Sequence, residues 1–364
     1  MATALKIPQE SFRLGCGRYI QKEGAISLLS QELAILNVKK PFVIGGKTAL
    51  SLTQELVASA LQPEGITPFF QTYIGFCCKE TCQEIMQSEE FKNSDVVIGI
   101  GGGNVMDAAK YCAMVSNKPL VNIPTSSATC AAFTPLSVCY NKLGQTVGTT
   151  HFGREVNCVI ADVDILCKQP VRLLVAGIYD SLAKLYELKQ RLIGIEQSEM
   201  DIGLYSSYSL SHCLTEILEN NLQKACEDVS NGKNTKTVSD VIFATIALTG
   251  VVSGLARGSN QTAIGHKIYD SSRALFPKPL YPFLHGEIVA IGLIAQIAYN
   301  GDDATAFKKQ MQSLRMPTTL SELGVAPTNE NLMLLYNKLV ESSAMAGTNE
   351  KEQQRLLEVL KIIQ

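Results

Sequence analysis

The stretch DVVIGIGGGNVMDAAKYCAMV (95–115) decides the fold class. An apolar, mostly β-branched run is followed by a glycine turn and then by the opening of a helix. The same order occurs twice on its N-terminal side, in KKPFVIGG with KTALSLTQELVASAL (39–61) and in GITPFFQTYIG with CKETCQEIMQSEEFK (65–92). Strands that alternate with helices predict a parallel, open twisted sheet covered by helices on both faces.

On the C-terminal side, KPLVNIPTS (118–126) and NCVIADVDIL (157–166) predict two more strands, with a hairpin between them in PLSVCY and TVGTTHFG (135–153). After about residue 165 the pattern is helical throughout. Gln169 and Pro170 can end the last strand and start a helix. We therefore expect an α/β domain over residues 1–164 and an all-α domain over residues 165–364, with a ligand site in the cleft between them.

The composition is that of a globular protein: 364 residues, 46% hydrophobic and 18% charged, with a formal net charge of −2. The chain has no long basic run, which argues against nucleic acid as a partner. The N-terminus MATALKIPQESFRLGCG lacks the layout of a signal peptide, and the longest apolar stretches carry Gly, Glu or Gln, so no membrane span is expected. The eleven cysteines are mostly scattered, which favours reduced thiols and a cytoplasmic location. The closest cluster, Cys77, Cys78 and Cys82, lacks a second ligand pair at zinc-site spacing.

Two loops carry residue types that bind phosphate. In GIGGGNVMDAAK (99–110), glycines let backbone N–H groups approach a pyrophosphate at a helix N-terminus, although a purely structural turn could use the same glycines. In VNIPTSSATC (121–130), hydroxyl groups follow the strand end where open α/β sheets bind ligands, although such a loop can also cap helices. The candidate phosphate contacts in these two loops are Gly102, Gly103, Thr125 and Thr129.

Two of the four histidines, His266 and His285, flank the proline-rich loop PKPLYP (277–282), which keeps them on separate helices. Asp180 lies in an apolar frame, where a carboxylate needs a partner. Two imidazoles and a carboxylate are a common ligand set for a catalytic divalent metal with one open position. An isolated histidine is more often a hydrogen-bonded core or surface residue, and we interpret His151 and His212 in that way.

The segments GGGNVMDAAK, IPTSSAT, LSVCY, PVRLLVAGIYDSLAK and FLHGEIVAIG occur in an order and spacing that resembles the glycerol dehydrogenase branch of the metal-dependent (iron-containing) alcohol dehydrogenase superfamily. The resemblance covers nearly the whole chain. It implies a Rossmann-like N-terminal domain and a helical C-terminal domain, an architecture shared with dehydroquinate synthase, and at least a homodimer. It also implies a metal held by Asp180, His266 and His285. The cofactor contacts implied by the same motifs are Gly103, Asn104, Thr125, Thr134, Leu136 and Tyr140.

Two positions depart from the pattern of these relatives. NAD-preferring relatives carry an acidic residue after the strand PFVIGG, whereas this chain has Gly46 and Lys47. A lysine can pair with a 2′-phosphate, so NADP(H) is expected in preference to NAD(H), unless Lys47 is an ordinary lysine at a helix start. Cys130 stands where glycerol-oxidising relatives carry an aspartate, and the loss of that charged acceptor favours a small 2-oxo acid. Arg257 or Lys267 could hold its carboxylate, although a lone cation is usually solvated.

Together these features predict a metal-dependent dehydrogenase that transfers a hydride between NAD(P)H and a small 2-oxo acid, similar in character to hydroxycarboxylate dehydrogenases. The metal, zinc in preference to iron, would polarise the ketone oxygen, and the proton source stays open. The alternative is a glycerol or 1,2-diol dehydrogenase that uses NAD. A phosphate-eliminating cyclase of the dehydroquinate synthase type would need a cluster of basic residues that the helical half lacks beside the predicted ligands.

Overall fold

The structure is a computed structural model that describes residues 12, 14–257 and 261–364. Most of the N-terminal segment in which we found no signal-peptide layout lies outside the described residues. The chain divides into two compact units, Met1–Leu174 with Asn221–Val251 and Val175–Asn220 with Val252–Gln364. Compared with the predicted boundary after residue 164, residues 165–174 and 221–251 therefore group with the sheet. The functional division into residues 1–164 and 165–364 stays a prediction.

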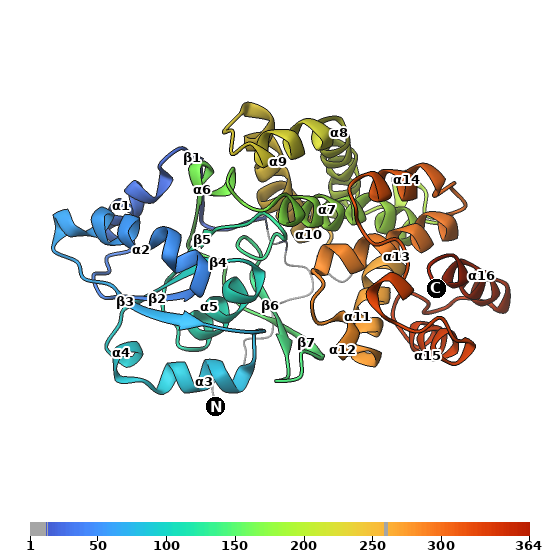
Figure 1. Ribbon diagram of the computed structural model, residues 1–364, viewed down its shortest axis with the longest axis horizontal. Helices are drawn as coiled ribbons and strands as arrows, with labels where there is room; N and C mark the ends of the chain where they lie inside the picture. The colour runs from blue at the N-terminus through green and yellow to red at the C-terminus, as the bar shows by residue number, and fades with distance from the viewer. Residues whose placement is uncertain (1–11, 13, 258–260) are drawn as a thin grey trace. The chain divides into compact units, whose positions relative to one another are not determined.

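The first unit is built on a six-stranded sheet with helices around it (Figure 1). The strand order is β1-β8-β5-β4-β2-β3, and all neighbouring strands are parallel, as predicted. The predicted hairpin is also present, as the antiparallel pair β6 and β7. The elements are β1 (Arg18–Lys22), α1 (Leu29–Ile35), β2 (Pro41–Gly46), α2 (Lys47–Leu61), β3 (Phe69–Tyr73), α3 (Lys79–Gln87), α4 (Glu89–Lys92), β4 (Val96–Gly101), α5 (Gly103–Val115), β5 (Leu120–Pro124), β6 (Leu136–Tyr140), β7 (Thr146–His151), β8 (Cys158–Asp162) and α6 (Val163–Leu166).

The helices α2 and α5 cover opposite faces of this sheet. Side chains of paired residues on parallel strands point to the same face, and Gly45 of β2 pairs with Ile100 of β4. A Cβ atom at Gly45 would meet Leu50 of α2, whereas a Cβ atom at Gly99, the neighbour of Ile100, would meet Ala109 of α5. The chain therefore leaves the adjacent strands β2 and β4 toward opposite sides.

Strand β1 was not predicted from the sequence. Its segment RYIQK mixes aromatic, aliphatic and charged residues and has no clear alternation. The strand forms at the edge of the sheet because Arg18–Lys22 pairs in register with Cys158–Asp162 of β8. A pairing partner so far along the chain leaves no local signal.

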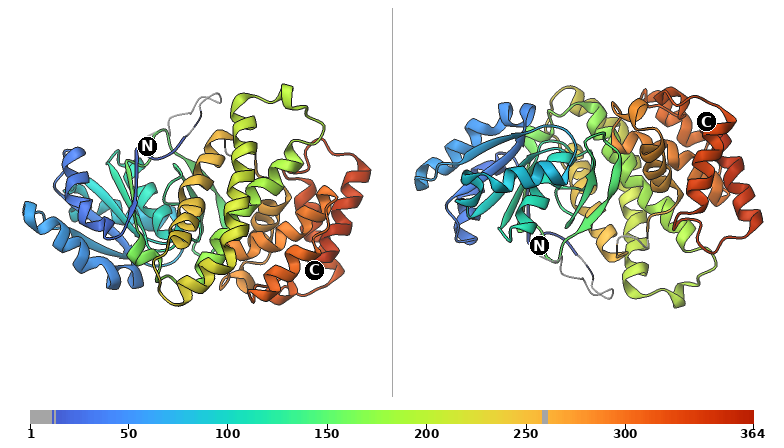
Figure 2. Two further views of the ribbon diagram at one scale, coloured as in Figure 1. Left: turned by 90° about the horizontal axis from the view of Figure 1, so that it is seen from above. Right: turned by 90° about the horizontal axis from the view of Figure 1, so that it is seen from below.

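Among the described residues of the second unit, all regular elements are helices, and Figure 2 shows this for the orange and red C-terminal part from two sides. Most of α7 and α8 and the C-terminal end of α10 belong to it, together with all later helices. The helices from α7 onward are α7 (Val171–Arg191), α8 (Ile202–Ser230), α9 (Lys236–Phe243), α10 (Thr249–Leu255), α11 (Ile264–Leu275), α12 (Pro277–Leu280), α13 (His285–Asn300), α14 (Thr305–Ser313), α15 (Asn329–Val340) and α16 (Glu350–Ile362).

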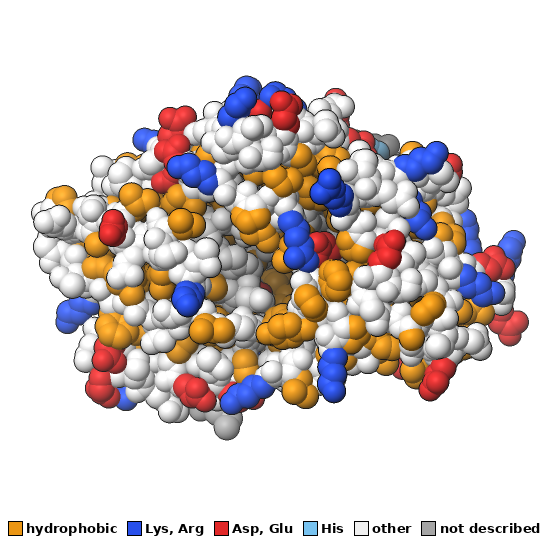
Figure 3. Space-filling model, in the orientation of Figure 1, with side chains coloured by type: hydrophobic (Ala, Val, Ile, Leu, Met, Phe, Trp, Pro, Cys, Tyr) orange, Lys and Arg blue, Asp and Glu red, His pale blue; other side chains and the backbone are white. Residues whose placement is uncertain are grey.

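One helical run, Lys236–Leu255, is long and apolar enough to cross a membrane by length and composition, so the prediction that no stretch meets these criteria is wrong. The mean hydropathy of the run remains high although it contains glycines at positions 250 and 254. In the structure, 56% of its most apolar window is buried, and the core helix of a globular protein passes the same test. On the face drawn in Figure 3, basic and acidic side chains of the described residues are interspersed, without a large patch of one sign.

Candidate active site

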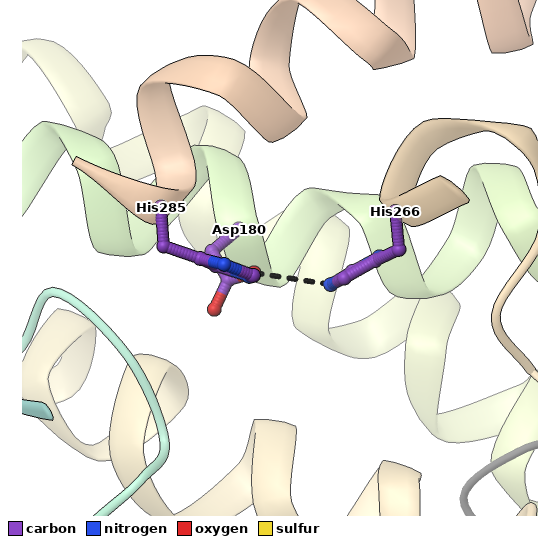
Figure 4. A group of neighbouring side chains, drawn as sticks. All are labelled: Asp180, His266 and His285. Carbon is purple, nitrogen blue, oxygen red and sulfur yellow. Dashed lines mark ion pairs between the residues drawn. The ribbon is translucent and has the colours of Figure 1, made fainter. Parts of the chain in front are cut away.

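Three helices of the second unit bring one carboxylate and two imidazoles together (Figure 4). Asp180 lies in the middle of α7, His266 in the first turn of α11, and His285 at the first position of α13. Asp180 Oδ1 is 3.3 Å from His266 Nε2 and 3.1 Å from His285 Nε2. The two histidines are on separate helices, as the prolines between them predict.

The charges of this group compensate one another in the absence of metal. Asp180 is only 4% exposed. Burial alone would raise the pKa of Asp180, but the charge of His285 and the two imidazole nitrogens that face the carboxylate hold it well below its usual value. Burial alone would lower the pKa of His266, but the charge of Glu187 and contacts with both carboxylates raise it to about 9. A cation that binds here replaces a proton on His266.

Glu187 belongs to the site although the sequence analysis did not single it out. Its carboxylate accepts hydrogen bonds from His266 Nδ1 at 2.6 Å and from the backbone N–H groups of Ala263 and His266, both at 2.8 Å. A proton held on Nδ1 leaves Nε2 as the free ligand atom toward Asp180. Glu187 follows Asp180 by seven residues, which places both side chains on one face of α7. This spacing of two acids in an apolar helix is the feature of the sequence that could have indicated Glu187 as part of the site.

Close contacts between helices position the candidate ligands. A Cβ atom at Gly286, directly after His285, would lie 1.9 Å from the carbonyl oxygen of Ala176 in α7. A Cβ atom at Gly292 would lie 2.4 Å from the carbonyl oxygen of Gly265 in α11. Helix α13 therefore approaches both other ligand helices at distances that only glycine permits.

Two further side chains hold the start of α13. Glu287 accepts a hydrogen bond from the backbone N–H of Leu284 at 2.8 Å, which fixes the first helical turn. Arg273, two turns after His266 on α11, donates to the carbonyl oxygen of Phe283 at 2.7 Å. The loop that precedes His285 is thereby tied to the helix that carries His266.

The spacing and donor types fit a divalent cation. The three ligand atoms lie within 4.8 Å of one another, and this is the group that can hold a metal among the described residues. Zinc bonds of about 2.0–2.1 Å in a tetrahedral shell place neighbouring ligand atoms roughly 3.3 Å apart. The separations of 3.1 and 3.3 Å match that value. The three residues would supply three ligands and leave one position for water or substrate.

The remaining histidines and the cysteine cluster stay outside this group. His151 is exposed at the end of β7, and His212 is exposed on α8, where its ring packs on Tyr208 with a centroid distance of 4.7 Å. The buried Cys77 and Cys82 do not form a group of metal ligands within the described residues.

The glycine turn and the Ser/Thr loop lie side by side at the carboxyl edge of the sheet in the first unit. Gly102 is the residue before α5, and a Cβ atom at Gly103 would be 3.1 Å from Thr129 Oγ1. Thr125 N donates to Gly101 O at 3.0 Å. Because the chain leaves β2 and β4 toward opposite faces, this edge is where doubly wound sheets bind nucleotides. Gly46 ends β2 and Lys47 begins α2 at the same edge.

A buried lysine connects this turn to the other predicted cofactor contacts. Lys110 of α5 pairs with Asp107 at 2.9 Å and donates to the carbonyl oxygens of Thr134, at 3.1 Å, and Leu136. It therefore fixes the start of β6, the strand that ends with Tyr140. Neither Asp107 nor Lys110 was predicted to have a role, although both belong to the motif that follows the glycines.

The residues considered as substrate contacts are Cys130, Arg257 and Lys267. Cys130 is half-buried in the loop after β5 of the first unit. Arg257 lies 3.6 Å from Asp201, and Lys267 lies 2.9 Å from Asp270 one turn along α11. Both cations considered for a substrate carboxylate thus already have acidic partners.

Comparison with known proteins gives the family. The profile of iron-containing alcohol dehydrogenases matches residues 16–164. Hydroxycarboxylate dehydrogenase A of Escherichia coli is 31% identical over 319 residues, covering 87% of this chain and 86% of that protein. Glycerol dehydrogenase of Thermotoga maritima is 28% identical over 337 residues, covering 90% and 89%. The crystal structure of a probable glycerol dehydrogenase from Sinorhizobium meliloti has the same fold, with a TM-score of 0.81 at 23% identity over 96% of this chain and 98% of that one.

The chain belongs to the iron-containing alcohol dehydrogenase family. It is an oxidoreductase of the glycerol dehydrogenase type that acts on alcohol groups, in a family that uses NAD(H) and a divalent metal.

Proposed function

We propose that the protein reduces a small 2-oxo acid with NADPH, or oxidises the corresponding 2-hydroxy acid, at a zinc ion held by Asp180, His266 and His285. The observation that carries the proposal is the convergence of these three side chains at distances that suit a tetrahedral cation. Similarity to a hydroxycarboxylate dehydrogenase and the uncharged Cys130 direct the choice of substrate. The glycerol dehydrogenase of Thermotoga maritima covers slightly more of the chain, 90% against 87%, at slightly lower identity, 28% against 31%. A glycerol or 1,2-diol substrate with NAD is therefore the second candidate.

When bound, the metal supplies a Lewis acid for the substrate oxygen and the nicotinamide supplies the hydride. Asp180 contributes a buried negative charge that binds the cation. Glu187 keeps the proton of His266 on Nδ1, so that Nε2 stays available as a ligand. The close contact of Gly286 with α7 keeps His285 within ligand distance of Asp180.

Glu187→Gln is expected to lower metal affinity by about 10- to 100-fold, the usual effect of removing a carboxylate that orients a ligating histidine. The amide can still accept from Nδ1, but it lacks the charge that favours the required tautomer. Titration of the metal-free protein with zinc measures the effect. Glu219→Gln on α8 is the control, because Glu219 contacts Tyr186 rather than a proposed ligand. Equal zinc affinity in wild type and Glu187→Gln would contradict this role.

NADP(H) is proposed because the carboxyl end of β2 carries no acid. Gly46 ends the strand, and Lys47 begins α2 with its side chain exposed. Among the described residues, the Lys47 ammonium has no ion-pair partner, so it is available for a 2′-phosphate.

Lys47→Glu is expected to shift the ratio of kcat/KM for NADPH over NADH by roughly 10- to 100-fold toward NADH, the value of one charge-assisted contact. Lys22→Glu, at the end of the edge strand β1, is the matched control. A ratio that stays the same in Lys47→Glu would mean that this lysine does not contact the cofactor.

The proposed reaction is tested with purified protein, 2-oxobutanoate and NADPH, before and after complete removal of metal by a chelator. We expect turnover that is lost on chelation and restored by zinc. The same preparation is assayed with glycerol or 1,2-propanediol and NAD. Turnover that survives complete metal removal would overturn the role of the metal, and faster turnover of the diols would favour the second candidate.

Cys130→Asp is expected to raise kcat/KM for a diol relative to 2-hydroxybutyrate by about tenfold, because the carboxylate accepts hydrogen bonds from hydroxyl groups and repels a carboxylate substrate. Cys213→Asp, at an exposed position of α8, is the control. A ratio that does not move would remove Cys130 from the substrate site. We further propose a homo-oligomer of at least two chains in the cytoplasm.

A further inference from the structure

A second buried cation lies on the helix that carries Asp180. Lys184 follows Asp180 by four residues and precedes Glu187 by three, so the three side chains share one face of α7. The side chain is buried, with an exposed fraction of 5% for the residue. Side chains of an α-helix lean toward its N-terminus, which directs the Lys184 stem back toward Asp180.

Lys184 lacks the contacts that buried lysines normally have. Lys110, the other buried lysine of the described chain, has a carboxylate and two carbonyl oxygens around its ammonium group. For Lys184, no hydrogen bond or ion pair is formed within the described residues, although Asp180 and Glu187 are on the same helix face. Burial raises the pKa of the Asp180 and Glu187 carboxyl groups, whereas the imidazoles and, more weakly, the charge of Lys184 lower it.

With a divalent cation bound at the proposed site, the positive charge of Lys184 is not balanced by a negative charge. The two carboxylates of Asp180 and Glu187 balance a bound divalent cation, and both imidazoles are neutral when they act as ligands. One positive charge on Lys184 then remains without a counter-charge in a buried position, which is costly. A neutral diol would leave it unpaired, whereas a carboxylate substrate would pair with it.

Other basic side chains of this unit near the site already have acidic or carbonyl partners. Arg257 and Lys267 lie beside Asp201 and Asp270, and the guanidinium of Arg191 donates to the carbonyl oxygens of Thr262 and Ser343. Arg273 donates to the carbonyl oxygen of Phe283. Among the described residues, Lys184 is thus a buried cation on the same helix face as Asp180 that forms no hydrogen bond or ion pair.

We propose that Lys184 binds the carboxylate of the 2-oxo acid substrate. This assignment rests on the proposed function and names the group that selects the substrate class. A 2-oxo acid carries its carboxylate directly on the ketone carbon, so a group that recognises it must lie beside the site that receives the ketone oxygen. Lys184 meets this condition because it is one helical turn from Asp180.

The test compares the zinc-loaded wild-type enzyme with Lys184→Met, using 2-oxobutanoate and its uncharged analogue 2-oxobutanamide. We expect the ratio of kcat/KM for acid over amide to fall by roughly 10- to 100-fold in Lys184→Met. Lys184→Arg, which keeps the charge, should retain part of the preference. Lys189→Met, the same substitution farther along α7 at a partly exposed residue, is the control and should keep the wild-type ratio.

A binding measurement separates recognition from turnover. Calorimetric titration of the zinc-loaded enzyme with oxamate, an unreactive 2-oxo acid analogue, should show a Kd that rises by a similar factor in Lys184→Met while the bound zinc stays at one per chain. An unchanged acid-to-amide ratio in a folded Lys184→Met enzyme would overturn the assignment. Equal loss of both substrates together with loss of zinc would also overturn it, because Lys184 would then only balance the two carboxylates. Wild-type enzyme that does not turn over 2-oxobutanoate would overturn the proposed function itself.

Discussion

His285→Ala is expected to abolish tight metal binding and to lower kcat/KM on the order of 10³-fold or more. The imidazole nitrogen of His285 lies 3.1 Å from Asp180 Oδ1, and in the proposed site it supplies one of only three protein ligands. A Lewis acid contributes several kcal/mol of transition-state stabilisation, and each 1.36 kcal/mol corresponds to a tenfold change in rate. Metal analysis of the purified variant and steady-state kinetics measure the two effects.

The controls separate ligand loss from damage to the fold. His212→Ala removes an exposed imidazole from α8 and should keep both zinc and activity. His285→Cys offers a thiolate, another zinc ligand, and should hold more zinc than the alanine variant. Near-wild-type zinc content in a folded His285→Ala protein would contradict the assignment of His285 as a ligand.

Gly286→Ala is expected to destabilise the protein by about 3 kcal/mol or more and to weaken zinc binding, although alanine is the better helix former. The added methyl group would lie 1.9 Å from the carbonyl oxygen of Ala176, and backbone atoms cannot rotate away. Helix α13 would have to move off α7, which separates His285 from Asp180. Denaturant unfolding of the metal-free protein measures the first effect, and zinc titration measures the second.

Ala298→Gly, near the other end of α13, is the matched control for a single methyl change in the same helix. It should cost only about 1 kcal/mol, the usual difference in helix propensity, and should leave zinc affinity unchanged. A Gly286→Ala protein that is as stable as wild type and binds zinc equally well would contradict the close contact between α13 and α7.

Much of the fold followed from local patterns. The strands at residues 41–46, 96–101, 120–124 and 158–162 are apolar, β-branched and bounded by Gly, Pro or Asp, and each was placed within a few residues. Strand β1 was missed because its pairing with β8 depends on residues about 140 positions away. The run Lys236–Leu255 has a strong local signal, but its composition alone does not distinguish a core helix from a membrane span.

For the candidate site, the residue types, the prolines between His266 and His285 and the resemblance to a known family were enough to choose Asp180, His266 and His285 from the sequence. Glu187 and Lys184 were not chosen, because an acid or a lysine in an amphipathic helix is ordinarily solvated. Only the tertiary structure shows that Glu187 is buried against His266 and that Lys184 is buried beside two carboxylates. The sequence by itself determined which atoms could bind a cation, since donor type is a property of each side chain. The distances between those atoms depend on how closely α13 packs on α7 and α11, and that packing exists only in the folded chain.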